Sequence, residues 1–215
     1  PYSVSTELFQ LISEHASANT SVISMHNQEA SSENDMFNSG TGDLIDKLKS
    51  FGIDLNSFDL SAKNSLESVV HKINSHCKLL LVHNTYSEKI DIESASQRES
   101  PVAWCFCPNA NIYIENNLPD FDMFSDTEQI LLLGTDSLAS NDQLNILSEM
   151  LLVQENSKVK LEELIKWACS NAAQFFSWND LGAFEKDMSP GLNWIENVDT
   201  VNFKIKKESK VHRLL

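Results

Sequence analysis

Two unbroken apolar runs restrict the folds open to this chain more than any other feature. Leu79 to Val82 form one run within CKLLLVHN, and Ile130 to Leu133 form the other within EQILLLGTDS. A strand without polar alternation suits burial on both faces, as in a parallel sheet covered by helices. The stretches TSVISMH at 20–26 and PVAWCFCPNAN at 101–111 predict two further strands.

Segments with helical spacing separate these strands. Helices are predicted at 5–17, 41–52, 62–76, 140–154 and 160–176. Ser5 or Thr6 suits the N-cap of the first helix, and Ser140 or Asn141 lies near the cap of the fourth. One apolar stripe of the fourth helix holds Leu144, Leu147 and Leu151. Helices that alternate with buried strands predict an α/β fold with a parallel sheet.

The pattern changes near the C-terminal end of the sequence. From Asp180 onward, glycine, proline and period-2 stretches replace the helical spacing. SPGLNWIENV at 189–198 and VNFKIKKE at 201–208 are predicted as strands, the second because its apolar and polar residues alternate. We therefore expect two parts, an α/β part over residues 1–179 and strands of a small β domain over residues 180–215.

Charge and cysteine content exclude several classes of protein. The 215 residues carry a net charge of −15, which argues against nucleic acid and anionic membranes as main partners. No apolar stretch reaches the roughly 18 residues of a membrane helix, and PYSVSTELFQ does not resemble a signal peptide. We expect a soluble, cytoplasmic protein. Cys105 and Cys107 lack the second pair of a zinc site, so we interpret them as buried apolar side chains.

Polar side chains recur at the C-terminal ends of the predicted strands. His26 ends the first strand, His83 the second and Asp136 the fourth, while Asn109 and Asn111 follow the third. In (β/α) barrels this rim carries the chemistry. A single polar residue there commonly serves solvation or capping, but chemically capable residues at three strand ends favour a site.

The residue types suggest metal-dependent hydrolysis. Histidine nitrogen and aspartate oxygen are ligands for zinc and similar divalent ions, which lower the pKa of a bound water. Asp136 suits both a ligand and a proton acceptor, and Glu29, three residues after His26, suits a proton donor to substrate. His83 suits stabilisation of developing charge or orientation of the water. His26 and Asp136 supply two ligands where three are usual, so the site needs a further contribution.

Several segments together resemble the amidohydrolase superfamily, in the aminohydrolase branch that holds deaminases and related chlorohydrolases. LLLGTDSLASNDQLNILSEM resembles the last barrel strand and helix, and SMHNQE resembles the H-x-x-E of the fifth strand. LLLVHN is similar to the sixth strand, CFCPNAN to the seventh, and the opening PYSVS to the residues after the fourth. The resemblance covers essentially the whole chain and implies strands 5–8 of a TIM (β/α)8 barrel plus strands of a small β-sandwich.

The resemblance implies a role for each matching residue. His26 would be a metal ligand, Asp136 a metal ligand and general base, and Glu29 a proton shuttle that contacts the substrate. His83 would lie near the attacking water, and Asn111 would help to line the substrate pocket. The implied cofactor is one divalent metal ion, zinc by preference and iron as the alternative.

The implied reaction is hydrolytic removal of ammonia from a purine-like or related heterocycle. Dechlorination or opening of a cyclic amide on the same site is one alternative, and a catalytically silent homologue or fragment that binds or assembles with a partner is another. No H-x-H pair occurs in the 215 residues, although the family places one on its first strand. The N-terminal half of the barrel is therefore expected in the parent protein. Assembly into a homodimer is a further alternative.

Overall fold

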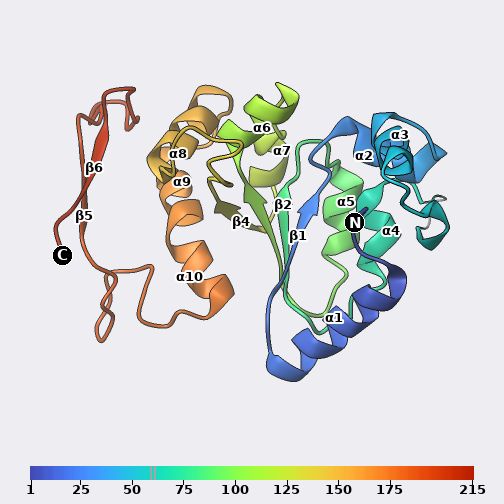
Figure 1. Cartoon of the computed structure of the whole chain (residues 1–215). Helices are drawn as coiled ribbons and strands as arrows, with labels where there is room; N and C mark the ends of the chain where they lie inside the picture. The colour runs from blue at the N-terminus through green and yellow to red at the C-terminus, as the bar shows by residue number, and fades with distance from the viewer. Residues whose placement is uncertain (59, 61) are drawn as a thin grey trace. The chain divides into compact units, whose positions relative to one another are not determined.

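A computed structural model describes residues 1–58, 60 and 62–215 (Figure 1). The chain divides into two compact units, residues 1–104 and 105–215. The predicted division between residues 179 and 180 stays a prediction. None of the helices in the described part of the chain combines the length and the apolar character that crossing a bilayer requires.

The first unit alternates strands with helices. Its elements are α1 (Thr6–Asn19), β1 (Ile23–Asn27), α2 (Ser31–Ser39), α3 (Asp43–Ser50), the 3-10 turn η1 (Leu55–Ser57), α4 (Ser65–Val70), β2 (Leu79–His83) and α5 (Lys89–Ala95). The division between the units falls inside β3 (Val102–Phe106). β1 and β2 pair in parallel, with Ile23 opposite Leu79 and Asn27 opposite His83. This register brings the C-terminal ends of both strands to one edge and confirms a parallel sheet with α/β character.

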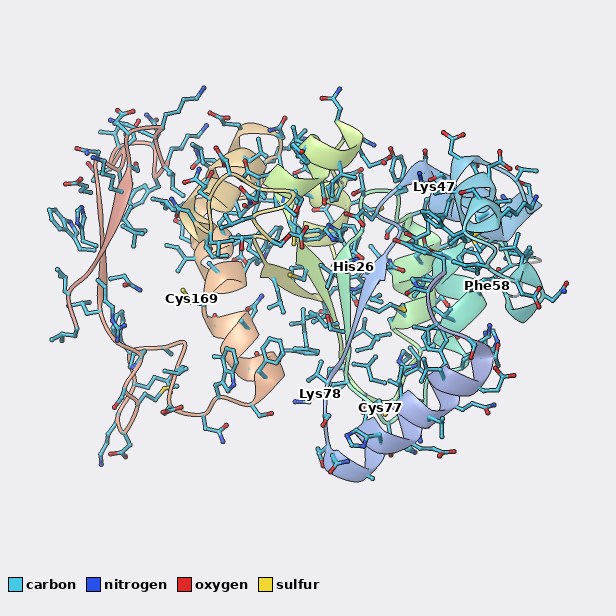
Figure 2. All side chains as sticks on the ribbon, viewed as in Figure 1. His26, Lys47, Phe58, Cys77, Lys78 and Cys169 are labelled. Carbon is cyan, nitrogen blue, oxygen red and sulfur yellow. The ribbon has the colours of Figure 1, made fainter. Side chains whose placement is uncertain are left out.

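Local sequence explains where α1 begins, and two contacts show where it packs. The Ser5 side chain accepts a hydrogen bond from the Leu8 N–H at 3.3 Å, so the predicted helix and its serine cap are confirmed. α1 packs against the segment before β2, where the Asn74 N–H donates to Ser13 Oγ at 2.7 Å and Cys77 is buried. Figure 2 labels Cys77 beside Lys78, directly before β2.

A small apolar cluster stabilises the helices that follow β1. Met36, Phe37, Ile45 and Leu48 are buried together, and the partly buried residues packed against them include Tyr2, Leu44 and Phe58. α2 was not predicted from the sequence, because its segment SSENDMFNS is polar and its N-cap, Ala30, makes no side-chain cap. Packing of Met36 and Phe37 therefore stabilises α2 more than its own helix propensity.

The second unit contains most of the remaining helices. They are α6 (Pro108–Glu115), α7 (Phe121–Ser125), α8 (Ile146–Glu155), α9 (Leu161–Ala168) and α10 (Ser170–Phe176), and the strands are β4 (Ile130–Leu133), β5 (Asn193–Glu196) and β6 (Lys210–Arg213). The Gly134 N–H donates to Phe106 O at 2.8 Å and joins the ends of β4 and β3. Phe106 lies against Phe121, Phe124 and Trp167, which form an aromatic core in this unit.

Three predicted helices differ from those observed. The helix expected at 62–76 is shorter, from Ser65 to Val70. The helix expected at 140–154 begins at Ile146, because the Asn145 side chain caps it by accepting the Leu147 N–H at 3.0 Å. Leu144 consequently lies outside the helix and is 63% exposed, so the predicted leucine stripe is wrong at that position. The helix expected at 160–176 is interrupted at Cys169, whose φ of −133° and ψ of −82° are not helical.

The strand predicted at 201–208 is also wrong. This segment forms turns, in which the Asp199 carboxylate accepts the N–H groups of Val201 and Asn202 and the backbone of Asp199 pairs with that of Lys204. Val201 and Phe203 are 85% and 60% exposed, so their alternation with polar residues does not mark a buried face. The strand that pairs antiparallel with β5 is β6, which begins two residues later, at Lys210.

Candidate active site

Three of the predicted site residues cluster at the C-terminal ends of β1 and β2. Glu29 Oε1 lies 3.4 Å from His83 Nε2, and Glu29 Oε2 lies 3.9 Å from His26 Nδ1. The two imidazole rings meet edge to face, with centroids 4.9 Å apart and planes at 87°. His26, which Figure 2 labels on β1, is 58% exposed in its side chain, whereas His83 is fully buried. One carboxylate therefore contacts both a solvent-facing and a buried histidine.

The backbone at these strand ends adopts left-handed conformations. φ is +47° at Gln28, +80° at His83 and +60° at Asn84, although none of these residues is glycine. Such conformations cost on the order of 1–3 kcal/mol each and persist only where the surroundings enforce them. In parallel α/β folds strained residues at this edge are a common feature of functional sites.

Glu33 in the first turn of α2 fixes the loop that carries Glu29. Its Oε1 accepts the Gln28 N–H at 3.0 Å and its Oε2 accepts the Glu29 N–H at 3.2 Å. Glu33 is only 1% exposed, and this burial raises the pKa of its carboxyl, while hydrogen bonds from Ser65, Gln28 and Glu29 act in the opposite direction. The Glu29 backbone is thus held from a buried carboxylate.

A buried amide network lies behind the cluster. Asn27 Nδ2 donates to Gln28 Oε1 and Asn84 Oδ1, both at 3.1 Å, and Gln28 Nε2 donates to Asp91 Oδ2 at 3.1 Å. Asp91 also accepts the Glu88 N–H at 2.8 Å at the start of α5. These bonds join the end of β1 and the residue after it to Asn84, directly after β2, and to Asp91 in α5. They explain how both strand ends keep their left-handed backbone.

The predicted base, Asp136, lies in the second unit, three residues after β4. Its backbone also has a positive φ, +55°, and its Oδ2 accepts a hydrogen bond from the hydroxyl of Ser140. Thr135 O, one residue earlier, accepts Asn141 Nδ2 at 2.8 Å. Asp136 is partly buried, so one face of its carboxylate is held by the loop and the side chain retains solvent access.

Asn111, the predicted substrate contact, is fully buried in α6 of the second unit. The structure therefore does not expose its side chain at the surface of this unit. Cys105 and Cys107 are both buried, as expected, and a Cβ added to Gly134 would lie 3.0 Å from Cys105 Sγ and 3.2 Å from Cys107 Sγ. A hydrogen bond from Cys105 and burial together raise the pKa of the Cys107 thiol, which makes it an unreactive group.

The donor set in the first unit fits a divalent metal ion. One ligand atom each from His26, Glu29 and His83 lies within 4.8 Å of the others. Ligands at about 2.0–2.2 Å from a tetrahedral zinc ion are about 3.3–3.6 Å apart, and the His83–Glu29 pair, at 3.4 Å, lies in this range. Two imidazole nitrogens and a carboxylate oxygen suit zinc and several other divalent ions.

Sequence reasoning missed two buried carboxylates. Glu33 and Glu149 are not among the residues predicted from the sequence, although they are only 1% and 0% exposed. The sequence signals neither residue, because the helix that carries Glu33 is not predicted and Glu149 lies in the interior of the helix predicted at 140–154.

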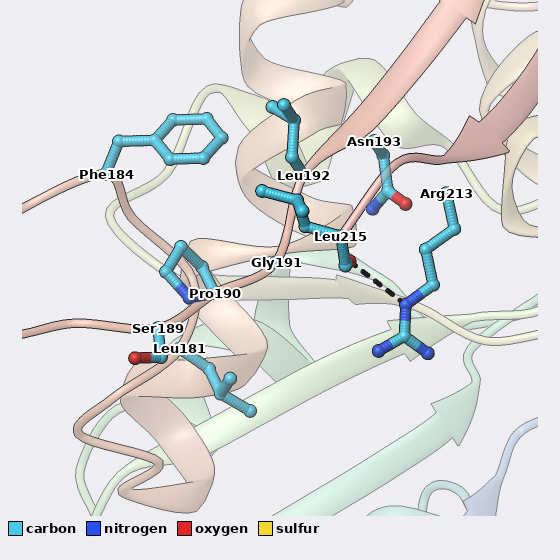
Figure 3. A pocket seen from close by; sticks show the side chains of 9 residues that line it. All are labelled: Leu181, Phe184, Ser189, Pro190, Gly191, Leu192, Asn193, Arg213 and Leu215. Carbon is cyan, nitrogen blue, oxygen red and sulfur yellow. Dashed lines mark hydrogen bonds between the residues drawn. The ribbon is translucent and has the colours of Figure 1, made fainter.

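An open pocket lies elsewhere, in the C-terminal segment of the second unit. Its lining includes Leu181, Phe184, Pro190 and Leu192, and the Arg213 Nε at its edge donates to Leu215 O at 3.1 Å (Figure 3). Neither Asn111 nor Asp136 contributes to it. The pocket is therefore separate from the residues that carry the predicted chemistry of this unit.

Comparison with known proteins identifies relatives over most of the chain. Residues 1–209 match the amidohydrolase family. The 5-methylthioadenosine/S-adenosylhomocysteine deaminase of Caldicellulosiruptor saccharolyticus is 29% identical over 129 residues, which are 56% of this chain and 29% of that protein.

Solved structures share the fold. The aminofutalosine deaminase of Helicobacter pylori superimposes with a TM-score of 0.76 at 20% identity, over 89% of this chain and 48% of that one. A variant of the atrazine chlorohydrolase of Arthrobacter aurescens, complexed with zinc and atraton, gives 0.62 at 17% identity, over 86% and 38%. This chain thus spans less than half the length of each of these three proteins.

Proposed function

Because the chain belongs to the amidohydrolase family, we propose that its parent protein is a metal-dependent hydrolase that removes ammonia from a purine-like heterocycle. The observation that carries this proposal is the contact of Glu29 with both His26 and His83 at the ends of two parallel strands. A carboxylate between two imidazoles suits movement of protons next to a cation.

We propose that the chain supplies strands 5–8 of a TIM (β/α)8 barrel, followed by strands of a small β-sandwich over residues 180–215. The parallel pairing of β1 with β2 and the deaminase structures with the same fold support this assignment. Four strands do not close such a barrel. An H-x-H pair from outside these 215 residues would complete the ligand set.

Each site residue then has its own task. His26 and Asp136 would hold the ion, and a bound zinc ion would lower the pKa of a water molecule beside it. Glu29 protonates the ring nitrogen of the substrate. Its side chain is 13% exposed and lies at a strand end, where the chemistry of such barrels is located. His83, buried and 3.4 Å from Glu29, orients the attacking water and stabilises developing charge.

The proton balance assigns the last step to Asp136. Water adds to the amidine-like carbon and loses one proton to the Asp136 carboxylate. That proton passes to the amino group, the carbon–nitrogen bond breaks and ammonia leaves. The proton of the added hydroxyl returns to the Glu29 carboxylate as the carbonyl product forms. The Ser140 hydroxyl, which donates to Asp136 Oδ2, keeps the carboxylate oriented during this transfer. The deaminase relatives support a substrate class of adenosine-like purines.

Metal analysis and an ammonia-release screen test the proposal. The full-length protein should contain about one divalent ion per chain, release ammonia from at least one purine or pterin, and lose this activity after chelation. A metal-free protein that is inert across the panel would favour a catalytically silent homologue. The triazine hydrolase structures favour dechlorination as a second candidate, which chloride release from a chlorinated triazine would reveal.

A further inference from the structure

Glu149, in the first turn of α8, occupies a position that the proposed chemistry does not use. Its side chain is fully buried, and both carboxylate oxygens accept hydrogen bonds. Oε2 accepts the Asn109 N–H at 2.9 Å, and Oε1 accepts Asn141 Nδ2 at 2.8 Å. Burial raises the pKa of this carboxyl, which shows that enclosing it has a cost. A buried carboxylate with two protein donors therefore needs an explanation.

One of these bonds leads to the loop that carries Asp136. Asn141 Nδ2 donates not only to Glu149 but also to Thr135 O, at 2.8 Å, directly before Asp136. Asp136 has a φ of +55°, a conformation that surrounding contacts must enforce. Glu149 fixes the Asn141 amide, and the amide in turn fixes the backbone next to Asp136.

The other bond leads to the segment that carries Asn111. Asn109 is the second residue of α6, so its N–H is one of those that have no acceptor within the helix. Glu149 supplies this acceptor two residues before Asn111. The start of α6 and the loop after β4 are thus joined through one side chain.

We propose that Glu149 is a positioning residue, which fixes the backbone next to Asp136 and joins it to the start of α6. The inference rests on the proposed function, because that function makes Asp136 a metal ligand and general base. A carboxylate is required, because Asn109 N–H and Asn141 Nδ2 both donate and each needs an acceptor oxygen. Glutamine has one acceptor oxygen, and its NH2 group would face one of these two donors. Glu149→Gln therefore breaks one of the two links.

The test uses the full-length, metal-loaded protein with Glu149→Gln and Glu155→Gln. Glu155 is exposed on the same helix and provides the matched control. We expect Glu149→Gln to lower kcat per folded molecule about 10- to 100-fold, the usual effect of removing an outer partner of a metal site, and Glu155→Gln to stay within about twofold of wild type. A purely structural role would lower the folded fraction and leave kcat per folded molecule unchanged.

Hydrogen–deuterium exchange supplies a readout that does not depend on activity. Exchange should accelerate over 107–112 or over 134–142 in Glu149→Gln, depending on which of the two links glutamine breaks, and in neither segment of Glu155→Gln. Unchanged exchange in both segments, or equal kcat in the two variants, would overturn the inference. A wild-type protein without ammonia release would refute the proposed function instead, and exchange would still test the links made by Glu149.

A second variant covers the case in which Glu149→Gln does not fold. Asn141→Ala removes the link to Thr135 O and leaves the bond between Glu149 and the Asn109 N–H in place. Faster exchange over 134–142 with unchanged exchange over 107–112 supports the inference. Unchanged exchange in both segments, together with unaltered kcat, overturns it.

Discussion

Replacement of Glu33 by glutamine tests how the loop of the candidate site is held. The wild-type carboxylate accepts two backbone N–H groups, from Gln28 at 3.0 Å and from Glu29 at 3.2 Å. The protonated carboxyl also keeps two acceptor oxygens, because its hydroxyl oxygen accepts when the proton points away from the loop. Glutamine retains one acceptor oxygen, so one of these buried N–H groups faces an NH2 group. A buried donor without its acceptor costs about 1–3 kcal/mol, and we expect the free energy of unfolding to fall by this amount at acidic pH.

The pH dependence of this loss has a defined sign. Burial raises the pKa of Glu33 in the folded protein. The stability that Glu33 contributes is therefore fully present below the usual pKa of a glutamate and is lost as pH rises through the higher folded value. Because glutamine does not titrate, the stability difference between wild type and Glu33→Gln should narrow as pH increases over that interval.

Urea unfolding of both proteins at several pH values measures this difference. Asp35→Asn serves as the control, because Asp35 is exposed on the same helix and makes no bond to the loop through its carboxylate in the described structure. A Glu33→Gln variant as stable as wild type at acidic pH, or a difference that widens as pH rises, would refute the reasoning. Asp35→Asn should show neither effect.

Two further substitutions test packing, one in each unit. Arg98 donates from its guanidinium to four backbone carbonyls between residues 70 and 77; Arg98→Lys cannot reach all four, and urea unfolding should show a loss of about 1–3 kcal/mol. Gly134→Ala would place a Cβ 3.0 Å from Cys105 Sγ and 3.2 Å from Cys107 Sγ. It should cost about 1–3 kcal/mol through overpacking, and adding Cys105→Ala should restore part of the melting temperature; no recovery would contradict this explanation.

The sequence predicted the positions of β1, β2 and β4 well, because their patterns depend on local composition. The strand predicted at 101–111 is too long, because residues from Pro108 onward form α6. Apolar runs identified β2 and β4, and Ser5 identified the start of α1. α2 was missed because tertiary packing of Met36 and Phe37 stabilises a polar segment. The strand expected at 201–208 failed because period-2 alternation does not distinguish a strand from turns whose polar groups cap one another.

The candidate site was predictable only in part for a similar reason. His26, Glu29 and His83 could be named because the ends of parallel strands share an edge, and the structure brings these three together. The roles of Glu33 and Glu149 depend on burial and on backbone N–H groups that converge on them. No spacing rule expresses such convergence, so only three-dimensional coordinates reveal it.

Kinetics of Glu29→Gln test the central claim most directly. The substitution keeps the size of the side chain and removes its ability to deliver a proton. Because the proposed ligands in this chain are His26 and Asp136, the metal content should stay at the wild-type level. We expect ammonia release by the full-length protein to fall by a factor of about 10²–10⁴, the usual contribution of a general acid. A Glu29→Gln variant that retains metal and releases ammonia at the wild-type rate would contradict the account.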